Sequence, residues 1–166
     1  MSPSLNSEIV SMNEVPFQDV EDDTSRRRVV LVVDDEPLVA DTLSIILSRA
    51  GYITMTAYDA QTALELAETM APDLMISDVA MPERNGVELA IAMLGSRPKC
   101  QVLLFSGHAT SDDLVQAFDA GHNFHLIAKP VHPTVMLRLV SRALGIPQRK
   151  TWGIHLAEII PIRRFA

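Results

Sequence analysis

Side chains that can handle phosphate each follow a short apolar run of the sequence. Asp34 and Asp35 follow the first run, Asp78 the third, Ser106 the fourth and Lys129 the fifth. Carboxylates that are brought together repel one another, so at neutral pH they require a cation. No histidine or cysteine accompanies them at ligand spacing, and an all-oxygen site favours a hard ion such as Mg²⁺.

Carboxylates, a magnesium ion, a hydroxyl and an amine together make a phosphoryl-handling site. The ion neutralises phosphoryl oxygens, the Lys129 ammonium holds another oxygen, and the Ser106 hydroxyl donates a hydrogen bond to a third. A carboxylate can itself be the nucleophile, which gives an aspartyl phosphate. Asp78 stands alone at the end of a strand expected in the middle of the sheet, so it is the best candidate.

These residues meet only if the apolar runs are neighbouring strands. The predicted strands are 29–33, 52–56, 74–77, 102–105 and 124–128. The predicted helices are 37–50, 60–70 with Asp59 as N-cap, 87–94, one from Thr110 or Ser111 to Asp119, and 133–144. Strands that alternate with helices predict an α/β fold, a five-stranded parallel sheet with helices on both faces. Ligands of such sheets bind outside the carboxyl ends of the strands.

Composition limits the classes of protein that remain. The 166 residues are 48% apolar and carry a net charge of −7, which fits about one domain with a sizeable core and argues against direct nucleic-acid binding. A single cysteine, Cys100, excludes an intramolecular disulfide and fits a reducing compartment. No apolar run is long enough for membrane insertion, and no signal pattern opens the chain. We therefore expect a cytoplasmic protein.

Charge divides the chain into three parts. Residues 1–28 are an acidic leader expected to be flexible, with the Arg26–Arg28 run either a solvated lead-in or a partner contact. Residues 29–146 form the domain. Residues 147–166 are a basic and apolar tail, too short for an output domain. This tail either docks on the domain or covers a dimer or kinase-docking surface.

Four motifs, taken together, resemble a response-regulator receiver domain of two-component signalling, over residues 29–146. They are VVDDEP at 32–37, DVAMP at 78–82 with Gly86, SGHA at 106–109, and KP at 129–130. Their order and separations also match: 43 residues from Asp35 to Asp78, 28 to Ser106 and 23 to Lys129. The resemblance implies the flavodoxin-like (βα)5 receiver fold.

The resemblance also implies roles for the acidic residues. Asp78 corresponds to the phosphoacceptor, which takes a phosphoryl group from the phosphohistidine of a histidine kinase. Asp35, Asp78 and the backbone carbonyl of Ala80 correspond to direct Mg²⁺ ligands, while Asp34 acts largely through a bound water. Such a domain is not an enzyme beyond its own phosphoryl acceptance and autodephosphorylation.

The remaining motif residues correspond to the apparatus around the phosphate. Ser106 resembles the switch hydroxyl, Lys129 the phosphate-contacting lysine, and Pro130 the proline whose preceding bond is typically cis. The family usually has an aromatic three residues before the lysine, where this chain has Leu126. Either a bulge brings Phe124 or its neighbour His125 to that place, or the aromatic is absent.

Three functions compete. The first is a stand-alone, phosphorylation-controlled interaction switch whose partners are a histidine kinase or histidine phosphotransfer protein and an unknown downstream protein, with a homodimer possible. The second is a phosphate shuttle or sink in a phosphorelay. The third is a Mg²⁺-dependent phosphatase, but such enzymes typically place a second aspartate two residues after the nucleophile, where Glu36 follows Asp34 and Ala80 follows Asp78.

Overall fold

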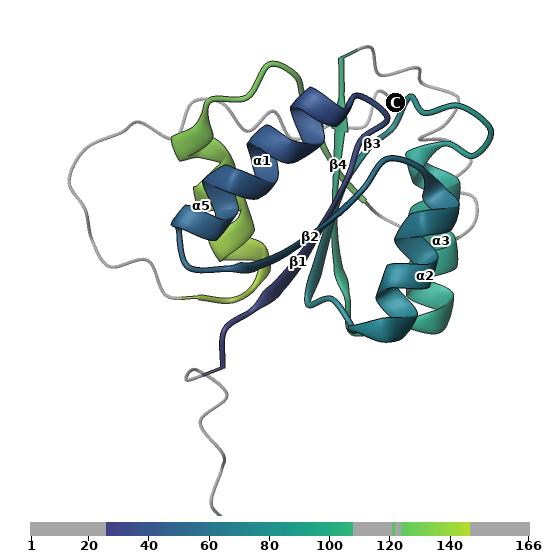
Figure 1. Cartoon of the computed structure of the whole chain (residues 1–166), viewed down its shortest axis with the longest axis horizontal. Helices are drawn as coiled ribbons and strands as arrows, with labels where there is room; N and C mark the ends of the chain where they lie inside the picture. Colours follow the sequence, from purple (N-terminus) through teal and green to yellow (C-terminus); the bar gives the residue numbers. More distant parts are fainter. Residues whose placement is uncertain (1–25, 108–120, 122–123, 147–166) are drawn as a thin grey trace, which may run out of the picture.

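The computed structural model describes residues 26–107, 121 and 124–146, in which strands and helices alternate (Figure 1). The strands are β1 (Val29–Val33), β2 (Ile53–Ala57), β3 (Leu74–Asp78), β4 (Gln101–Ser106) and β5 (His125–Ala128). The helices are α1 (Pro37–Arg49), α2 (Ala60–Thr69), α3 (Gly86–Ser96) and α5 (Pro133–Ala143). The ends of these elements agree with the sequence prediction to within two residues. The helix predicted to end at Asp119 lies outside the described residues.

The strands form one parallel sheet in the order β2-β1-β3-β4-β5. Helices α1 and α5 cover one face and helices α2 and α3 cover the other (Figure 1). This arrangement confirms the predicted fold class. The chain passes from β1 to β2 on one side and then crosses back over β1 to β3 on the other, so the order of strands reverses beside β1. A ligand crevice is expected at this reversal, outside the carboxyl ends of the strands.

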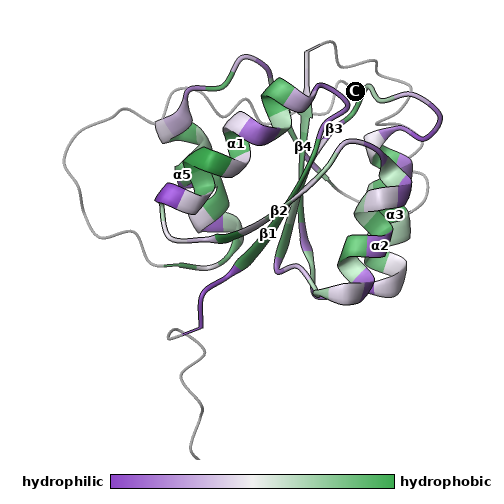
Figure 2. Ribbon diagram, viewed as in Figure 1, coloured by the Kyte–Doolittle hydropathy of each residue, from purple (hydrophilic) through white to green (hydrophobic). Residues whose placement is uncertain are grey.

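The central strands are apolar because both of their faces are covered. Along β1, Val30 and Val32 pack with α1 and α5, while Leu31 and Val33 pack with α2 and α3. All of β1 and β3 is buried, and Figure 2 shows the hydrophobic colour running along these central strands. A buried side chain of this size stabilises the fold by about 1.5–3 kcal/mol. Two cores, one on each face, therefore hold the sheet rigid.

Local signals set where the helices begin and end. Pro37 occupies the first turn of α1, and Gly51 follows α1 with a φ of +99° that other residues rarely adopt. The Asp59 side chain accepts a hydrogen bond from the Thr62 amide at 2.7 Å, which confirms it as the N-cap of α2. No helix in the described ranges is long and apolar enough to cross a membrane.

The arginine run before β1 is attached to the domain. Arg26 and Arg28 both form ion pairs with Asp73, in the segment between α2 and β3. The other carboxylate oxygen of Asp73 accepts a hydrogen bond from the Val29 amide at 2.7 Å. Arg27 donates to the Gly51 carbonyl at 3.2 Å. These contacts attach residues 26–28 to the domain, although Arg26 and Arg27 remain exposed to solvent.

Candidate functional site

The predicted site residues lie at the carboxyl ends of adjacent strands. Asp34 directly follows β1, Asp78 ends β3, Ser106 ends β4 and Lys129 directly follows β5. The sheet order makes these four strands neighbours, and the Lys129 amide donates to the Ser106 carbonyl at 2.8 Å. The parallel sheet thus brings together side chains that are up to 95 residues apart in the sequence.

Lys129 connects two of the acids directly. Its Nζ lies 2.8 Å from Asp34 Oδ2 and 2.6 Å from Asp78 Oδ1. Burial lowers the pKa of Lys129, but its hydrogen bonds to Asp34 and Asp78 and their charges outweigh burial, so the pKa is raised above its ordinary value. The ammonium is therefore charged at neutral pH. It provides one positive charge for two carboxylates.

The carboxylates of Asp34 and Asp78 are both buried, and hydrogen bonds or ion pairs fix their positions. Asp34 is 2% exposed, and its second oxygen accepts a hydrogen bond from the Glu36 amide at 3.0 Å. Asp78 is 8% exposed and contacts Lys129 through its Oδ1 atom. Asp35, the next residue along from Asp34, is half-buried. A buried carboxylate with only part of a counter-charge is a strong candidate for chemistry.

Ser106 provides a hydroxyl that the described part of the protein leaves unsatisfied. The residue is 2% exposed, and its Oγ is buried without a hydrogen-bond partner. A buried polar atom without a partner costs about 1–3 kcal/mol, so it requires an explanation. A hydroxyl that is kept available for a ligand oxygen explains the observation. Ser106 ends β4, which pairs with β3 alongside Asp78.

A fixed turn presents the predicted carbonyl ligand, Ala80. The Val79 carbonyl accepts hydrogen bonds from the Met81 amide at 3.1 Å and from the Gly86 amide at 2.9 Å. The Val79 amide in turn donates to the Phe105 carbonyl at 2.8 Å. Ala80 itself is exposed. These bonds hold the backbone that follows Asp78 against both β4 and the first residue of α3.

The donor chemistry of the site fits a hard divalent cation. Asp34, Asp35, Asp78 and the Ala80 carbonyl offer only oxygen, the element that Mg²⁺ prefers. Among the described residues, however, no three histidine, cysteine or acidic side chains are gathered closely enough to hold a metal ion. Asp34 and Asp78 are instead spanned by the Lys129 ammonium. The predicted set of three carboxylates around a metal therefore stays a prediction.

The register of β5 shows which residue occupies the position three before Lys129, where the family usually has an aromatic. The Lys129–Pro130 peptide bond is cis, as the sequence resemblance implied. The pairing of β5 with β4 is regular, with His125 opposite Leu103 and Leu126 opposite Leu104. No bulge within β5 shifts another residue into register, so Leu126 holds the position three residues before Lys129. Its side chain is half-buried and packs with the core on the side of α2 and α3.

Sequence reasoning missed one residue of the site, Ser77. Its hydroxyl is fully buried beside Asp78 and donates to the Asp78 backbone carbonyl at 2.9 Å. The available signal was a polar residue that ends an otherwise apolar run, Leu74-Met75-Ile76. A buried strand position that is polar usually has a specific hydrogen-bond partner.

Comparisons with known proteins agree with this geometry. A family model described as the response regulator receiver domain matches residues 30–141. An uncharacterized 14.6 kDa protein of Leptolyngbya boryana is 40% identical over 116 residues, which are 68% of this chain and 87% of that protein. The regulatory protein AtoC of Escherichia coli is 30% identical over 79% of this chain but only 28% of its own length. Like AtoC, several curated relatives are far longer than the part that this chain spans.

Solved structures agree as well. A CheY-like receiver domain protein from Methanospirillum hungatei has a TM-score of 0.68 at 28% identity, over 72% of this chain and 95% of that one. The chemotaxis protein CheY4 of Vibrio cholerae has a TM-score of 0.65 at 28% identity, over 71% of this chain and 99% of that one.

Proposed function

This chain belongs to the response regulator receiver domain family, and from its site we propose that Asp78 accepts a phosphoryl group from a phosphohistidine. The donor is a histidine kinase or a histidine phosphotransfer protein, since receiver domains in general act with histidine kinases in two-component signalling. The observation that carries the proposal is the contact of one ammonium, Lys129, with both Asp34 and Asp78 at the rim of the sheet.

The proposed transfer balances as a simple displacement. One carboxylate oxygen of Asp78 forms a bond to phosphorus while the bond from phosphorus to the donor imidazole nitrogen breaks. The electron pair of that bond stays on the imidazole nitrogen. Lys129 moves its contact from the Asp78 carboxylate to an oxygen of the arriving phosphoryl group, and Ser106 donates its free hydrogen bond to another. The product is an aspartyl phosphate.

Receiver domains in general bind Mg²⁺, and in this chain Asp34, Asp35, Asp78 and the Ala80 carbonyl are the groups that would hold it. When bound, Mg²⁺ supplies positive charge for the phosphoryl oxygens. The chain's own contribution is to bury Asp34 and Asp78 and to limit their counter-charge to Lys129. Family members are in general signalling domains without enzymatic activity, so the expected output is a change of binding surface.

A second function, a phosphate shuttle or sink, is favoured by Leu126. An aliphatic side chain stands in regular register at the place where the family usually has an aromatic. If the aromatic side chain couples movement of Ser106 to a change in a binding surface, its absence removes that coupling. A shuttle predicts rapid loss of phosphate and no change in association state on phosphorylation, whereas a switch predicts a change in association state, which size-exclusion chromatography would detect.

The experiment that tests the proposal is direct phosphorylation. Purified protein is incubated with acetyl phosphate and Mg²⁺, and its intact mass is measured. The wild-type protein should gain the mass of one phosphoryl group, and the Asp78→Asn protein should gain none. Absence of the mass increase in the wild-type protein, or an equal increase in Asp78→Asn, would exclude Asp78 as the acceptor.

A further inference from the structure

Ser77 is a buried hydroxyl residue directly before the proposed phosphoacceptor. It lies in β3, between Val33 of β1 and Leu104 of β4, and is fully buried. Its Oγ donates a hydrogen bond of 2.9 Å to the backbone carbonyl of Asp78. An apolar residue would fill such a position with less loss of hydration, so the hydroxyl requires a specific reason.

The same carbonyl is enclosed from the other side by Gly86. A Cβ atom on Gly86 would lie 2.0 Å from the Asp78 carbonyl oxygen and 3.0 Å from Ser77 Oγ. Both distances are shorter than van der Waals contact, so only glycine fits at the first position of α3. The Asp78 carbonyl is therefore held between a hydroxyl that donates to it and the start of α3, which approaches it closely.

This enclosure sets the direction of the Asp78 backbone. The carbonyl bonds to Ser77 on one side of the peptide, and the Val79 amide on the other side bonds to the Phe105 carbonyl. A peptide plane fixed at both of its polar groups cannot rotate without the loss of one bond. This plane therefore anchors the backbone on the carboxyl side of the Asp78 Cα atom, from which the carboxylate that contacts Lys129 projects.

We propose that Ser77 is a positioning residue for phosphoryl acceptance, which acts by orienting the Asp78 peptide through its hydroxyl. The inference rests on the proposed role of Asp78 as acceptor. Ser77 does not touch the reacting atoms, because its hydrogen bond goes to the backbone. Loss of the hydroxyl removes one of the two hydrogen bonds that hold the acceptor peptide, which loosens the backbone at Asp78 and lowers the fraction of molecules that are ready to react.

The test compares two serine-to-alanine variants, each of which removes a buried hydroxyl that donates to a backbone carbonyl. Ser77→Ala removes the bond to Asp78, and Ser141→Ala removes another buried hydroxyl that donates to a backbone carbonyl, that of Ile146 at 3.3 Å. Ser141 lies in the last turn of α5. Urea unfolding measures stability, and intact mass against time measures the rate of phosphorylation by acetyl phosphate with Mg²⁺. Both variants should lower the urea midpoint, but only Ser77→Ala should slow phosphorylation, by roughly tenfold.

A third variant separates positioning from packing. Ser77→Thr keeps the hydroxyl and suits a β-strand, so it should phosphorylate within about twofold of the wild-type rate. A wild-type rate in Ser77→Ala, or the same slowing in Ser77→Thr as in Ser77→Ala, would overturn the inference. Failure of the proposed function looks different, since wild-type protein would then gain no phosphoryl group at all.

Discussion

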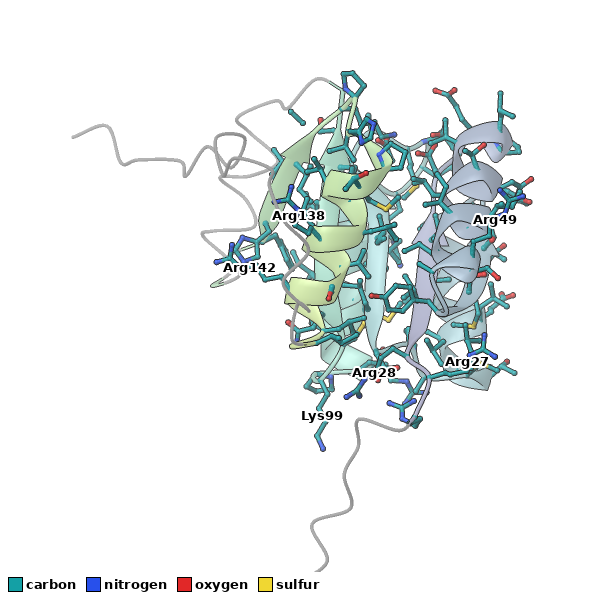
Figure 3. All side chains as sticks on the ribbon, turned by 90° about the vertical axis from the view of Figure 1, so that its left-hand side faces the viewer. Arg27, Arg28, Arg49, Lys99, Arg138 and Arg142 are labelled. Carbon is teal, nitrogen blue, oxygen red and sulfur yellow. The ribbon has the colours of Figure 1, made fainter. Side chains whose placement is uncertain are left out.

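The two ends of the sheet both pair aspartate with basic side chains, but they do so in opposite ways. At the carboxyl end, Lys129 contacts Asp34 and Asp78, and the Asp34 side chain is 3% exposed. At the amino end, Asp73 pairs with Arg26 and Arg28, and the Arg26 side chain is 52% exposed. Figure 3 shows Arg27, Arg28 and Lys99 along the lower part of the view, which is the amino end of the sheet.

The comparison shows how similar ion pairs take different roles. At the amino end two cations serve one carboxylate, and that carboxylate also satisfies the Val29 amide, so charge and hydrogen bonding are both complete. At the carboxyl end one ammonium serves two buried carboxylates, and Ser106 Oγ has no partner among the described residues. The amino-end pairs fasten the chain, while the carboxyl end retains negative charge and a free donor for a ligand.

The largest effect on stability is expected from Gly86→Ala. The new Cβ would meet the Asp78 carbonyl at 2.0 Å, so the start of α3 must move, at a cost of about 3 kcal/mol in unfolding free energy. Gly95→Ala is the matched control, because that glycine lies in the same helix with no atom within 4 Å of the added Cβ. Gly95→Ala should stabilise by about 0.5–1 kcal/mol. Urea unfolding of both variants checks this, and equal effects would refute the close contact at Gly86.

The second largest effect is expected from removal of the Lys129 ammonium, which Asp34 and Asp78 share. Lys129→Met leaves two buried carboxylates without their ammonium, which should cost about 2 kcal/mol in buffer with EDTA. The phosphorylation rate should fall at least about tenfold, because a charge that contacts the phosphoryl group is lost. Added Mg²⁺ should restore part of the stability.

The control is Arg28→Met, at the other end of the sheet. This change should lower the unfolding free energy by less than about 1 kcal/mol and leave the phosphorylation rate unchanged. Greater stability of Lys129→Met in EDTA would contradict the account.

A smaller effect is expected from Asp73→Ala at the amino end. The change leaves the Val29 amide without its bond and two arginines without their carboxylate, at a cost of about 1–2 kcal/mol. The rate of phosphorylation should match that of the wild-type protein, because Asp73 lies at the opposite edge of the sheet. A slower rate at equal folded fraction would mean that the two ends are coupled.

The smallest effect on the free energy of unfolding is expected from alkaline pH, which acts through Lys129 at the carboxyl end of the sheet. The pKa of Lys129 is raised in the folded protein by Asp34 and Asp78, against the effect of burial. Its contribution to stability is therefore complete below the unfolded pKa of about 10.4 and is lost as the pH rises through the folded pKa. The difference in unfolding free energy between wild-type protein and Lys129→Met, measured from pH 8 to 11, should narrow at the alkaline end. A difference that grows with pH would have the wrong sign.

The sequence predicts most of the fold because the signals are local. Continuous apolar runs indicate the strands, and Pro37, Asp59 and Gly51 mark the ends of helices. Convergence of the polar residues at one edge follows from parallel strands alone, so Asp34, Asp78 and Lys129 could be predicted to meet. These predictions require no knowledge of side-chain packing.

The rest depends on packing between distant segments. The sequence does not indicate that the Lys129 ammonium contacts both Asp34 and Asp78, since side-chain positions at the rim of the sheet decide this. The contact of Gly86 with the Asp78 carbonyl depends on how closely α3 approaches β3. The pairing of Arg26 with Asp73 joins residues 47 apart, and nothing in an isolated arginine run indicates such a partner.

Mapping of the phosphoryl group tests the central claim, that the carboxyl end of the sheet is the reactive end. Protein treated with acetyl phosphate and Mg²⁺ is reduced with borohydride, which converts an aspartyl phosphate to homoserine, and is then digested and sequenced by mass spectrometry. Homoserine is expected at Asp78 and at no other position. Homoserine at Asp73 or at Asp35, or a digest without homoserine, would contradict it.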